Sequence, residues 1–183
     1  MKLLFASDIH GSAFYCEKLC ACIEKEAPDR VVLLGDLLYH GPRNDISYGY
    51  DPKKVAAMLN ERSNHIIAVR GNCDAEVDQM MLDFPCMGDY STILTDDGFT
   101  FFATHGHLWS PHETATLPAM NAFVYGHTHI KQCELKDGIL LLNPGSVSLP
   151  KDGSHSYAVY ENKTATLKTL EGVQIKSEPI HTP

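Results

Sequence analysis

Apolar runs alternate with helical patterns in the first half of the chain. Residues 2–6 (KLLFA) and 30–34 (RVVLL) are short, apolar and rich in aliphatic side chains, which is typical of buried strands. Between them, apolar side chains recur at the spacing of one helix face, at Cys16, Leu19, Cys20 and Ile23. Ser12 precedes this pattern as a candidate N-cap, and Pro28 follows it. The pattern predicts a strand, a helix that ends before Pro28, and a second strand.

A second helix and a third strand follow. Asp51 and Pro52 form the N-cap and first-turn signature of a helix whose apolar face carries Val55, Met58 and Leu59. Residues 65–69 then form another apolar run. The resulting β-α-β-α-β order predicts parallel strands joined by right-handed crossovers.

The second half of the chain has shorter strand-like runs and tighter turns. An Asp-Asp-Gly turn at 96–98 separates two such runs, and residues 123–146 and 156–170 continue in the same style. No repeat or change in composition indicates a linker. We therefore expect one α/β domain over residues 1–183, with a parallel first half and a more hairpin-like second half. We expect the last residues, SEPIHTP, to fray.

Composition sets limits on location and partners. The first residues, MKLLFASDIHG, are too short an apolar run for a secretory signal, and no stretch is long enough to span a membrane. The six cysteines have no Cys-x-x-Cys spacing. The lack of an export signal favours reduced thiols and a cytoplasmic location. A formal charge of -8 argues against binding of a nucleic-acid polymer. Small phosphorylated substrates remain compatible, because a bound metal can supply local positive charge. A homo-oligomer also remains open.

Polar side chains with metal-binding chemistry follow the apolar runs. Each of six runs ends in a small residue beside a carboxylate, amide or imidazole, in the segments Asp8–His10, Gly35–Asp36, Gly71–Asp74, His105–His107, Gly126–His129 and Asn143–Ser146. The carboxyl ends of parallel strands share one edge of a sheet, and ligands bind there. Asp8/His10 and His127/His129 are each spaced by two, so strand geometry would project each pair to one side.

Each of these features is weak by itself. A single His-x-His is more often incidental than metal-binding, and an Asp at a strand end is usually a helix cap or a turn former. Their joint arrival at one edge is the informative signal. The combined set contains imidazole and oxygen donors but no thiolate: Asp8, His10, Asp36, Asn72, His105, His127 and His129.

Seven such donors are too many for one ion, and the mixture suits manganese, iron or zinc better than a structural tetrahedral zinc. Two ions that share a bridging carboxylate would use all seven. Such a centre attracts a phosphate anion, lowers the pKa of a bridging water toward about 7, and aligns attacking and leaving oxygens.

The motifs D-x-H, GD, GN-x-D, HGH, GH-x-H and NPGS, taken in this order, resemble the calcineurin-like metallophosphoesterase superfamily. The short length and the GNCD segment look like its YfcE-type bacterial phosphodiesterases. The resemblance implies a four-layer α/β/β/α sandwich, a metallophosphoesterase-like α/β fold with its site at the carboxyl ends of the strands. It covers residues 8–146.

The resemblance also implies roles for individual residues. Asp8, His10 and His129 would hold the first ion, and Asn72, His105 and His127 the second, with Asp36 between the two ions. Asp74 would support these ligands from behind, while its simpler interpretation is the N-cap of a helix that begins at Ala75.

Cys73 departs from the family pattern. Many members of the family carry a histidine there that assists the leaving group, so its absence favours activated or diester substrates. We interpret Cys73 as a spectator rather than as a nucleophile or ligand.

Three further polar residues are candidates for the same site. His107 lies two residues after His105 and is either a supporting catalytic or phosphate contact, or a solvated loop histidine. His40 and Arg43 follow Asp36 in a loop and are candidate substrate contacts, with an exposed loop as the alternative. The remaining histidines, His65, His112, His155 and His181, we assign to the surface or to packing. Tyr48, Tyr50 and Trp109 either wall a pocket or pack against neighbouring loops.

These observations predict a metal-dependent phosphodiesterase that acts on a small phosphodiester through a hydroxide held at two divalent transition-metal ions. Manganese is the first expectation, with iron, zinc, nickel and magnesium as alternatives. A phosphomonoesterase or nucleotidase of the same fold is the second hypothesis. A protein-binding scaffold is the third, because the retromer complex uses a subunit of this fold; the intact ligand set argues against it.

Overall fold

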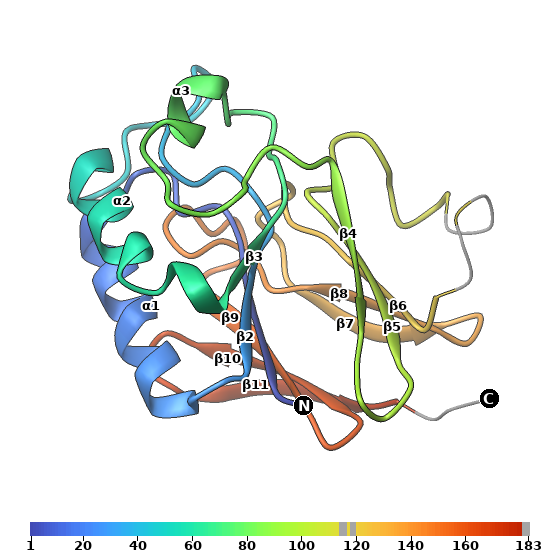
Figure 1. The fold of residues 1–183 in the computed structure, drawn as a ribbon. Coiled ribbons are helices and arrows are strands. Elements are labelled where there is room, and N and C mark those ends of the chain that lie inside the picture. The colour runs from blue at the N-terminus through green and yellow to red at the C-terminus, as the bar shows by residue number, and fades with distance from the viewer. Residues whose placement is uncertain (114–116, 118–119, 181–183) are drawn as a thin grey trace.

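Two β-sheets pack face to face, and helices cover the outer face of the first (Figure 1). The structure is a computed structural model that describes residues 1–113, 117 and 120–180. The first sheet has the strand order β11-β10-β9-β1-β2-β3, and the second has the order β4-β5-β6-β8-β7.

The strands of the first sheet come from both ends of the chain. They are β1 (Leu3–Ala6), β2 (Arg30–Leu33), β3 (Ile66–Ala68), β9 (Ser156–Glu161), β10 (Thr164–Thr169) and β11 (Gln174–Pro179). β1, β2 and β3 are parallel, as the β-α-β-α-β pattern predicts. β9 pairs antiparallel with β1, and β10 and β11 extend that side as a meander.

The second sheet consists of β4 (Tyr90–Leu94), β5 (Thr100–Thr104), β6 (Ala122–Val124), β7 (Gln132–Lys136) and β8 (Ile139–Asn143). β4 and β5 form the hairpin predicted around the turn at 96–98. β5, β6 and β8 are parallel. The first half of the chain thus supplies parallel strands, and the second half is richer in hairpins, as predicted. The second half also contributes the parallel strands β5, β6 and β8, which the sequence did not indicate. The expectation that SEPIHTP frays was wrong for Ser177–Pro179, which pair with β10; residues 181–183 lie outside the described part.

The two long helices begin at the caps that the sequence predicts, and the first ends before Pro28. Ser12 caps α1 (Ala13–Glu26) by accepting the Tyr15 N–H, and the chain leaves the helix through Ala27 in a left-handed conformation. Asp51 caps α2 (Pro52–Asn60) by accepting the Lys54 N–H. A 3₁₀ turn, η1 (Ser63–His65), and a short helix, α3 (Glu76–Gln79), complete the set in the described residues.

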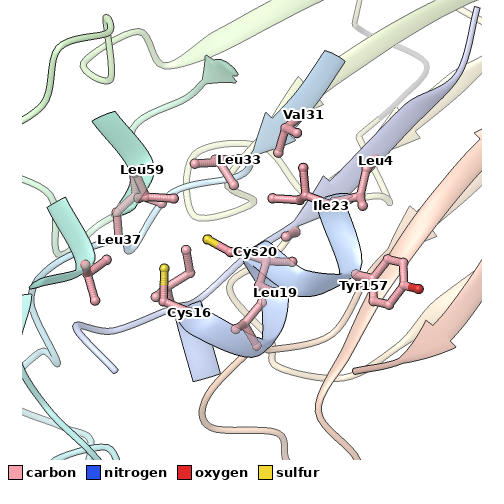
Figure 2. Packing of buried hydrophobic residues seen from close by; sticks show 14 of the residues in the cluster. Leu4, Cys16, Leu19, Cys20, Ile23, Val31, Leu33, Leu37, Leu59 and Tyr157 are labelled. Carbon is pink, nitrogen blue, oxygen red and sulfur yellow. The ribbon is translucent and has the colours of Figure 1, made fainter. Parts of the chain in front are cut away.

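Successive side chains of β1 point to opposite faces of the first sheet, and both faces are buried. Leu4 faces α1 and α2 and packs in one core with Cys16, Leu19, Cys20 and Ile23 (Figure 2). Leu3 and Phe5 face the second sheet and pack against Phe101 and Leu140. Continuous apolar runs, rather than alternating ones, are expected for strands that are covered on both sides.

The outer face of the second sheet is covered by side chains from the loop between β5 and β6. Trp109, Leu117 and Met120 pack there against a cluster that contains Phe102 and Phe123. Within the described residues, this layer of the predicted α/β/β/α sandwich consists of loop side chains and no helix.

Glu26, at the end of α1, joins this helix to the first sheet. Its carboxylate accepts hydrogen bonds from Lys168 Nζ (2.6 Å) and from the Tyr157 hydroxyl (3.0 Å), and it pairs with Lys2 Nζ (2.9 Å). Burial opposes ionisation of Glu26, but these partners outweigh it and lower the carboxyl pKa from 4.5 to about 2. A depressed folded-state pKa stabilises the fold above pH 4.5, and this contribution is lost as the pH falls toward 2.

We expect Glu26→Gln to lower the free energy of unfolding at pH 7 by about 1–2 kcal/mol, because charge-assisted hydrogen bonds are lost. Urea unfolding at several pH values should show the difference from wild type shrinking below pH 4.5. Glu17→Gln, at an exposed position of the same helix, is the control and should change stability by less than about 0.5 kcal/mol. A difference that stays constant with pH would contradict this interpretation.

Candidate metal centre

The predicted ligands lie on loops that leave the strands in a strained backbone conformation. Five of the seven have positive φ: Asp8 (58°), His10 (47°), Asp36 (55°), His127 (65°) and His129 (59°). Side chains with a Cβ rarely adopt this region, and such outliers cluster at functional sites. Strand geometry, the condition for each of the pairs Asp8/His10 and His127/His129 to project to one side, therefore does not continue that far. β1 ends at Ala6 and β6 at Val124, and left-handed turns aim the side chains instead.

Asp8, His10 and His129 form one buried cluster. Asp8 Oδ1 lies 3.2 Å from His129 Nε2 and 3.6 Å from His10 Nε2. The two imidazole nitrogens lie 3.3 Å apart. The three side chains come from the ends of β1 and β6, in different sheets, and they are almost fully buried. The fold thus brings together the three residues predicted for the first ion.

The tautomers of three histidines follow from their outer hydrogen bonds. In each, Nδ1 lies within hydrogen-bond distance of a main-chain carbonyl oxygen: His10 with Tyr39 (2.9 Å), His105 with Leu34 (2.6 Å) and His129 with Leu149 (2.7 Å). A carbonyl only accepts, so Nδ1 carries the proton, and in a neutral ring Nε2 presents a lone pair to the centre. Histidines that bind a metal through one ring nitrogen usually donate the other N–H to a carbonyl or carboxylate in this way.

The donors in this centre fit a cation. Asp8 Oδ1 is fully buried and has no hydrogen-bond partner, although Nε2 of His10 and of His129 both face it. With the protons on Nδ1, a carboxylate oxygen and two lone pairs point at one another, an arrangement that is repulsive unless positive charge lies among them. The oxygen and imidazole set is one that divalent transition metals bind.

A second group surrounds Asp36. Its Oδ2 lies 3.5 Å from His105 Nε2 and 3.7 Å from His10 Nε2, so one oxygen faces both groups. Asn72 Oδ1 lies 3.1 Å from His105 Nε2, and the His127 ring lies 5.1 Å from the His105 ring. Asp8, Asp36 and His105 also offer donor atoms within 4.8 Å of one another, so the two groups are contiguous.

Electrostatics favours positive charge around the two carboxylates of this centre. Burial raises the pKa of Asp8 and of Asp36, but the neighbouring imidazoles outweigh it and lower both. Burial likewise opposes protonation of His105, but pairing with Asp36 and the field of Asp8 raise its pKa to about 9. Burial and the nearby His105 lower the pKa of His127. Two ionised carboxylates in a buried pocket attract protons or metal cations alike.

Asp74 supports the loop that carries Asp36. Its carboxylate accepts the N–H groups of Asp36 (2.8 Å), Leu37 (2.9 Å) and Gly71 (2.7 Å). The interpretation of Asp74 as a helix N-cap was wrong, because α3 begins at Glu76 and Asp78 accepts the Ala75 N–H instead. The carboxylate of Asp74 therefore fixes the loop after β2 against the loop after β3.

Gly126 is required where two loops touch. A Cβ there would lie 1.9 Å from Ser7 Oγ and 2.9 Å from Asp8 Oδ2, distances that no side chain tolerates. The missing side chain lets the His127 N–H reach Asp8 Oδ2 at 3.1 Å. The loop after β6 can therefore lie directly on the loop after β1.

The segment Asn143–Ser146 supports the same two loops, a role that was not assigned from the sequence. Asn143 Nδ2 donates to Gly126 O (2.8 Å) and Thr128 Oγ1 (3.0 Å), and Ser146 Oγ donates to Asp8 O (2.9 Å). Ser148 Oγ donates to Asp8 O as well (3.1 Å). The signal was present in the sequence, since NPGS ends an apolar run as the ligand segments do.

A polar cleft of about 750 Å³ opens beside the two groups. Asp36, Asn72, His127 and His129 line it, together with the cationic side chains Arg43 and Lys151. Arg43 is exposed on its loop and also lines the cleft, so its role as a substrate contact stays a prediction. Lys151 was missed; its N–H donates to His129 O at 3.0 Å, which fixes it beside a predicted ligand.

His40 and His107 lie close to the cleft in different ways. The His40 ring packs against Tyr39 and Tyr50 and is not among the side chains that line the cleft. The His107 ring lies 5.3 Å from that of His105 and 6.3 Å from that of His127, and its buried Nδ1 has no hydrogen-bond partner. Burial and the neighbouring imidazoles lower the pKa of His107.

Cys73 lies closer to the centre than its place in the sequence indicates. Its Sγ lies within 4.8 Å of donor atoms of His10 and Asp36, and its N–H donates to Asp36 Oδ1 at 2.8 Å. Burial and the Asp36 carboxylate raise the pKa of the thiol to about 12. The side chain is a neutral thiol at neutral pH, which is the poor state for a nucleophile or a ligand.

The other histidines and loop aromatics lie away from the cleft. His65 and His112 are exposed, His155 stacks on Tyr15, and His181 lies outside the described residues. Trp109 packs on the outer face of the second sheet, and the exposed Tyr48 packs on Phe14. No helix in the described part of the chain has the length and apolarity of a membrane span.

The sequence pattern of the calcineurin-like phosphoesterase superfamily domain matches residues 1–165, which include all seven predicted ligands. The chain belongs to this superfamily. The superfamily binds divalent metals, which agrees with the cluster at the strand ends.

Three relatives of different distance are informative. Phosphodiesterase YfcE of Escherichia coli K12 is 44% identical over 96% of this chain and 95% of its own. A solved structure of YfcE covers 99% of this chain and all of that one, with a TM-score of 0.93. Phosphodiesterase MJ0936 of Methanocaldococcus jannaschii is 35% identical over 79% of this chain and 83% of its own. Vps29 of Entamoeba histolytica, 19% identical with a TM-score of 0.66 over 97% of both chains, shares the fold.

We expect Asp74→Asn to weaken metal binding by roughly 10- to 100-fold, because an amide cannot accept all three N–H groups that hold the Asp36 loop. Titration of metal-free protein with Mn²⁺ and Zn²⁺ measures the effect. Asp78→Asn is a matched control, since Asp78 has the same low exposure but accepts only the Ala75 N–H. Equal metal affinities in the two variants would show that Asp74 does not hold the ligand loop.

Proposed function

We propose that this chain is a metal-dependent phosphodiesterase with two divalent ions at the carboxyl ends of its strands. Asp8, His10 and His129 would hold one ion, and Asn72, His105 and His127 the other. Asp36 would contribute to both. The buried Asp8 Oδ1, which has no hydrogen-bond partner and faces two imidazole nitrogens, is the observation that carries this proposal.

The Asp36 carboxylate supports the assignment of two ions rather than one. Its Oδ2 faces His10 on one side and His105 on the other, at similar distances. Its Oδ1 accepts the Cys73 N–H, and this hydrogen bond holds the carboxylate in its orientation. Oδ2 therefore stays between the two groups of side chains. A single oxygen held between two groups suits a bridging ligand.

The ions, when bound, supply positive charge toward an anionic phosphate and lower the pKa of water so that hydroxide is available near neutral pH. The protein contributes the rest of the site. Nδ1 hydrogen bonds hold the His10, His105 and His129 rings in one orientation. Arg43 and Lys151 offer charge to a phosphate that enters the cleft. His107, with its unpartnered Nδ1, is placed to contact that phosphate or to pass a proton.

The donors narrow the choice of metal. Imidazole, carboxylate and amide groups suit Mn²⁺ first, with Fe, Zn, Ni and Mg as alternatives to test. The neutral Cys73 thiol near Asp36 does not favour a thiophilic metal, because the pKa of that thiol is raised to about 12.

A small phosphodiester is the substrate that we propose. YfcE, the 44% identical relative, is a phosphodiesterase. Cys73 stands where many family members carry a histidine that assists the leaving group, which favours diesters over monoesters of poor leaving groups. A phosphomonoesterase is the second candidate, because Arg43 and Lys151 could compensate the extra charge of a monoester.

The six cysteines are free, and we therefore place the protein in the cytoplasm. The net charge of -8 argues against binding of nucleic-acid polymers.

We expect the metal-reconstituted chain to hydrolyse bis(4-nitrophenyl) phosphate faster than 4-nitrophenyl phosphate, and metal removal to abolish both activities. Asp36→Asn should lower kcat for the diester by at least about 100-fold, because the shared carboxylate is lost. For the same reason, the variant should bind fewer than two metal ions per chain. Release of 4-nitrophenolate and elemental analysis are the two measurements.

Asp45→Asn, at an exposed position on the loop that follows Asp36, is the control and should leave rate and metal content unchanged. A chain that binds one ion and hydrolyses the diester at full rate would refute the two-ion centre. A faster rate on the monoester would favour the second candidate.

We expect Cys73→Ser to retain kcat within about threefold and to bind the same amount of metal, because a thiol with a pKa of about 12 is not ionised at neutral pH. Kinetics with the same diester, together with elemental analysis, measure this. A collapse of kcat with unchanged metal content would identify the thiol as a reactive group.

A further inference from the structure

A second, apolar pocket of about 350 Å³ lies next to the polar cleft. Leu38, Tyr50, Val77 and Met81 line it, and Tyr39 and Cys73 line both the pocket and the cleft. The two cavities are therefore neighbours that share a wall. Its volume is at the lower end of the range for small-molecule sites.

The shared wall is attached to the predicted metal ligands. The His10 ring donates from Nδ1 to Tyr39 O, and the Cys73 N–H donates to Asp36 Oδ1. These bonds hold the main chain of both wall residues next to His10 and Asp36. The pocket therefore lies directly beside the predicted metal centre.

The aromatic residues of the pocket are held by an imidazole. The His40 ring lies 4.6 Å from the Tyr39 ring and 5.4 Å from the Tyr50 ring, and it meets the Tyr50 ring nearly edge to face. Such geometry is favourable for aromatic pairs. His40 thereby supports two pocket residues, and it is not among the side chains that line the pocket or the polar cleft.

The pocket offers little to a polar group. Its charged side chains are Lys53 and Asp78, and the Asp78 carboxylate already accepts the Ala75 N–H. Val77 and Met81, by contrast, are apolar and remain 61% and 42% exposed. An apolar occupant would remove that surface from water.

We propose that this pocket binds one ester arm of the substrate, an aryl or similarly flat apolar group, while the phosphate lies in the polar cleft. The inference rests on the proposed function, because it needs a phosphoryl group at the metal centre. The division matches the chemistry of a diester: a charged group enters the cleft of Arg43 and Lys151, and an apolar group attached to it reaches across Tyr39 and Cys73.

Phenylphosphonate and methylphosphonate test this subsite without any need for turnover. Both carry the same phosphonate group, and they differ in one arm. Calorimetry with the Mn²⁺-reconstituted wild-type chain should show phenylphosphonate binding about tenfold more tightly, because the ring leaves water for the pocket. Met81→Glu should bring this ratio close to one, since it places a carboxylate in the pocket.

Met80→Glu is the matched control. Met80 is the adjacent residue, 82% exposed, and it does not line the pocket. It should keep the tenfold ratio. Val77→Asp, at a 61% exposed position, provides a second pocket variant if Met81→Glu fails to fold.

Equal affinity of the wild-type chain for the two phosphonates, or an unchanged ratio in a folded Met81→Glu or Val77→Asp protein, would overturn the subsite. If instead a second copy of the chain covers this face, Met80→Glu and Met81→Glu would both lower the mass of the assembly measured by sedimentation. Neither variant would then change the ratio of the two phosphonate affinities. Absence of metal-dependent diester hydrolysis in the wild-type chain would contradict the proposed function alone, since the binding ratio is measured separately.

Discussion

The structure depends on the burial of two carboxylates among imidazole lone pairs. Asp8 Oδ1 and Asp36 Oδ2 face Nε2 atoms whose rings are fixed by Nδ1 hydrogen bonds to main-chain carbonyls. Protein interiors tolerate such an arrangement only with positive charge, which protons on the imidazoles or bound metal cations can supply. The site therefore attracts cations, and the surrounding fold holds the two carboxylates and the imidazoles close together.

Holding these side chains together requires loops that are strained and that are supported by hydrogen bonds from other segments. The left-handed turns at five of the predicted ligands would relax if the chain were free, since each costs free energy. Asp74 holds the loop after β2 through three N–H groups, and Asn143 and Ser146 hold the loops after β6 and β1. These supports come from the end of β3 and the end of β8, so both sheets contribute to one centre.

The surroundings of the centre divide into two kinds of surface. A polar cleft with Arg43 and Lys151 lies on one side of Tyr39 and Cys73, and an apolar pocket lies on the other. Cys73 belongs to both, and its raised pKa makes it an apolar wall rather than a charged group. A neutral thiol at this position is compatible with the proposed substrate, which is part phosphate and part apolar group.

Local sequence determined which residues end the strands and what chemistry they carry. The capping of α1 by Ser12, the buried run of β1 and the donor types after each strand follow from neighbouring residues alone. Tertiary structure decided that β9 returns to pair with β1, that Asp74 accepts three N–H groups instead of capping α3, and that Cys73 reaches the centre. The physical reason is range: periodicity and capping act within a few residues, whereas strand partners and left-handed turns are set by contacts between distant segments.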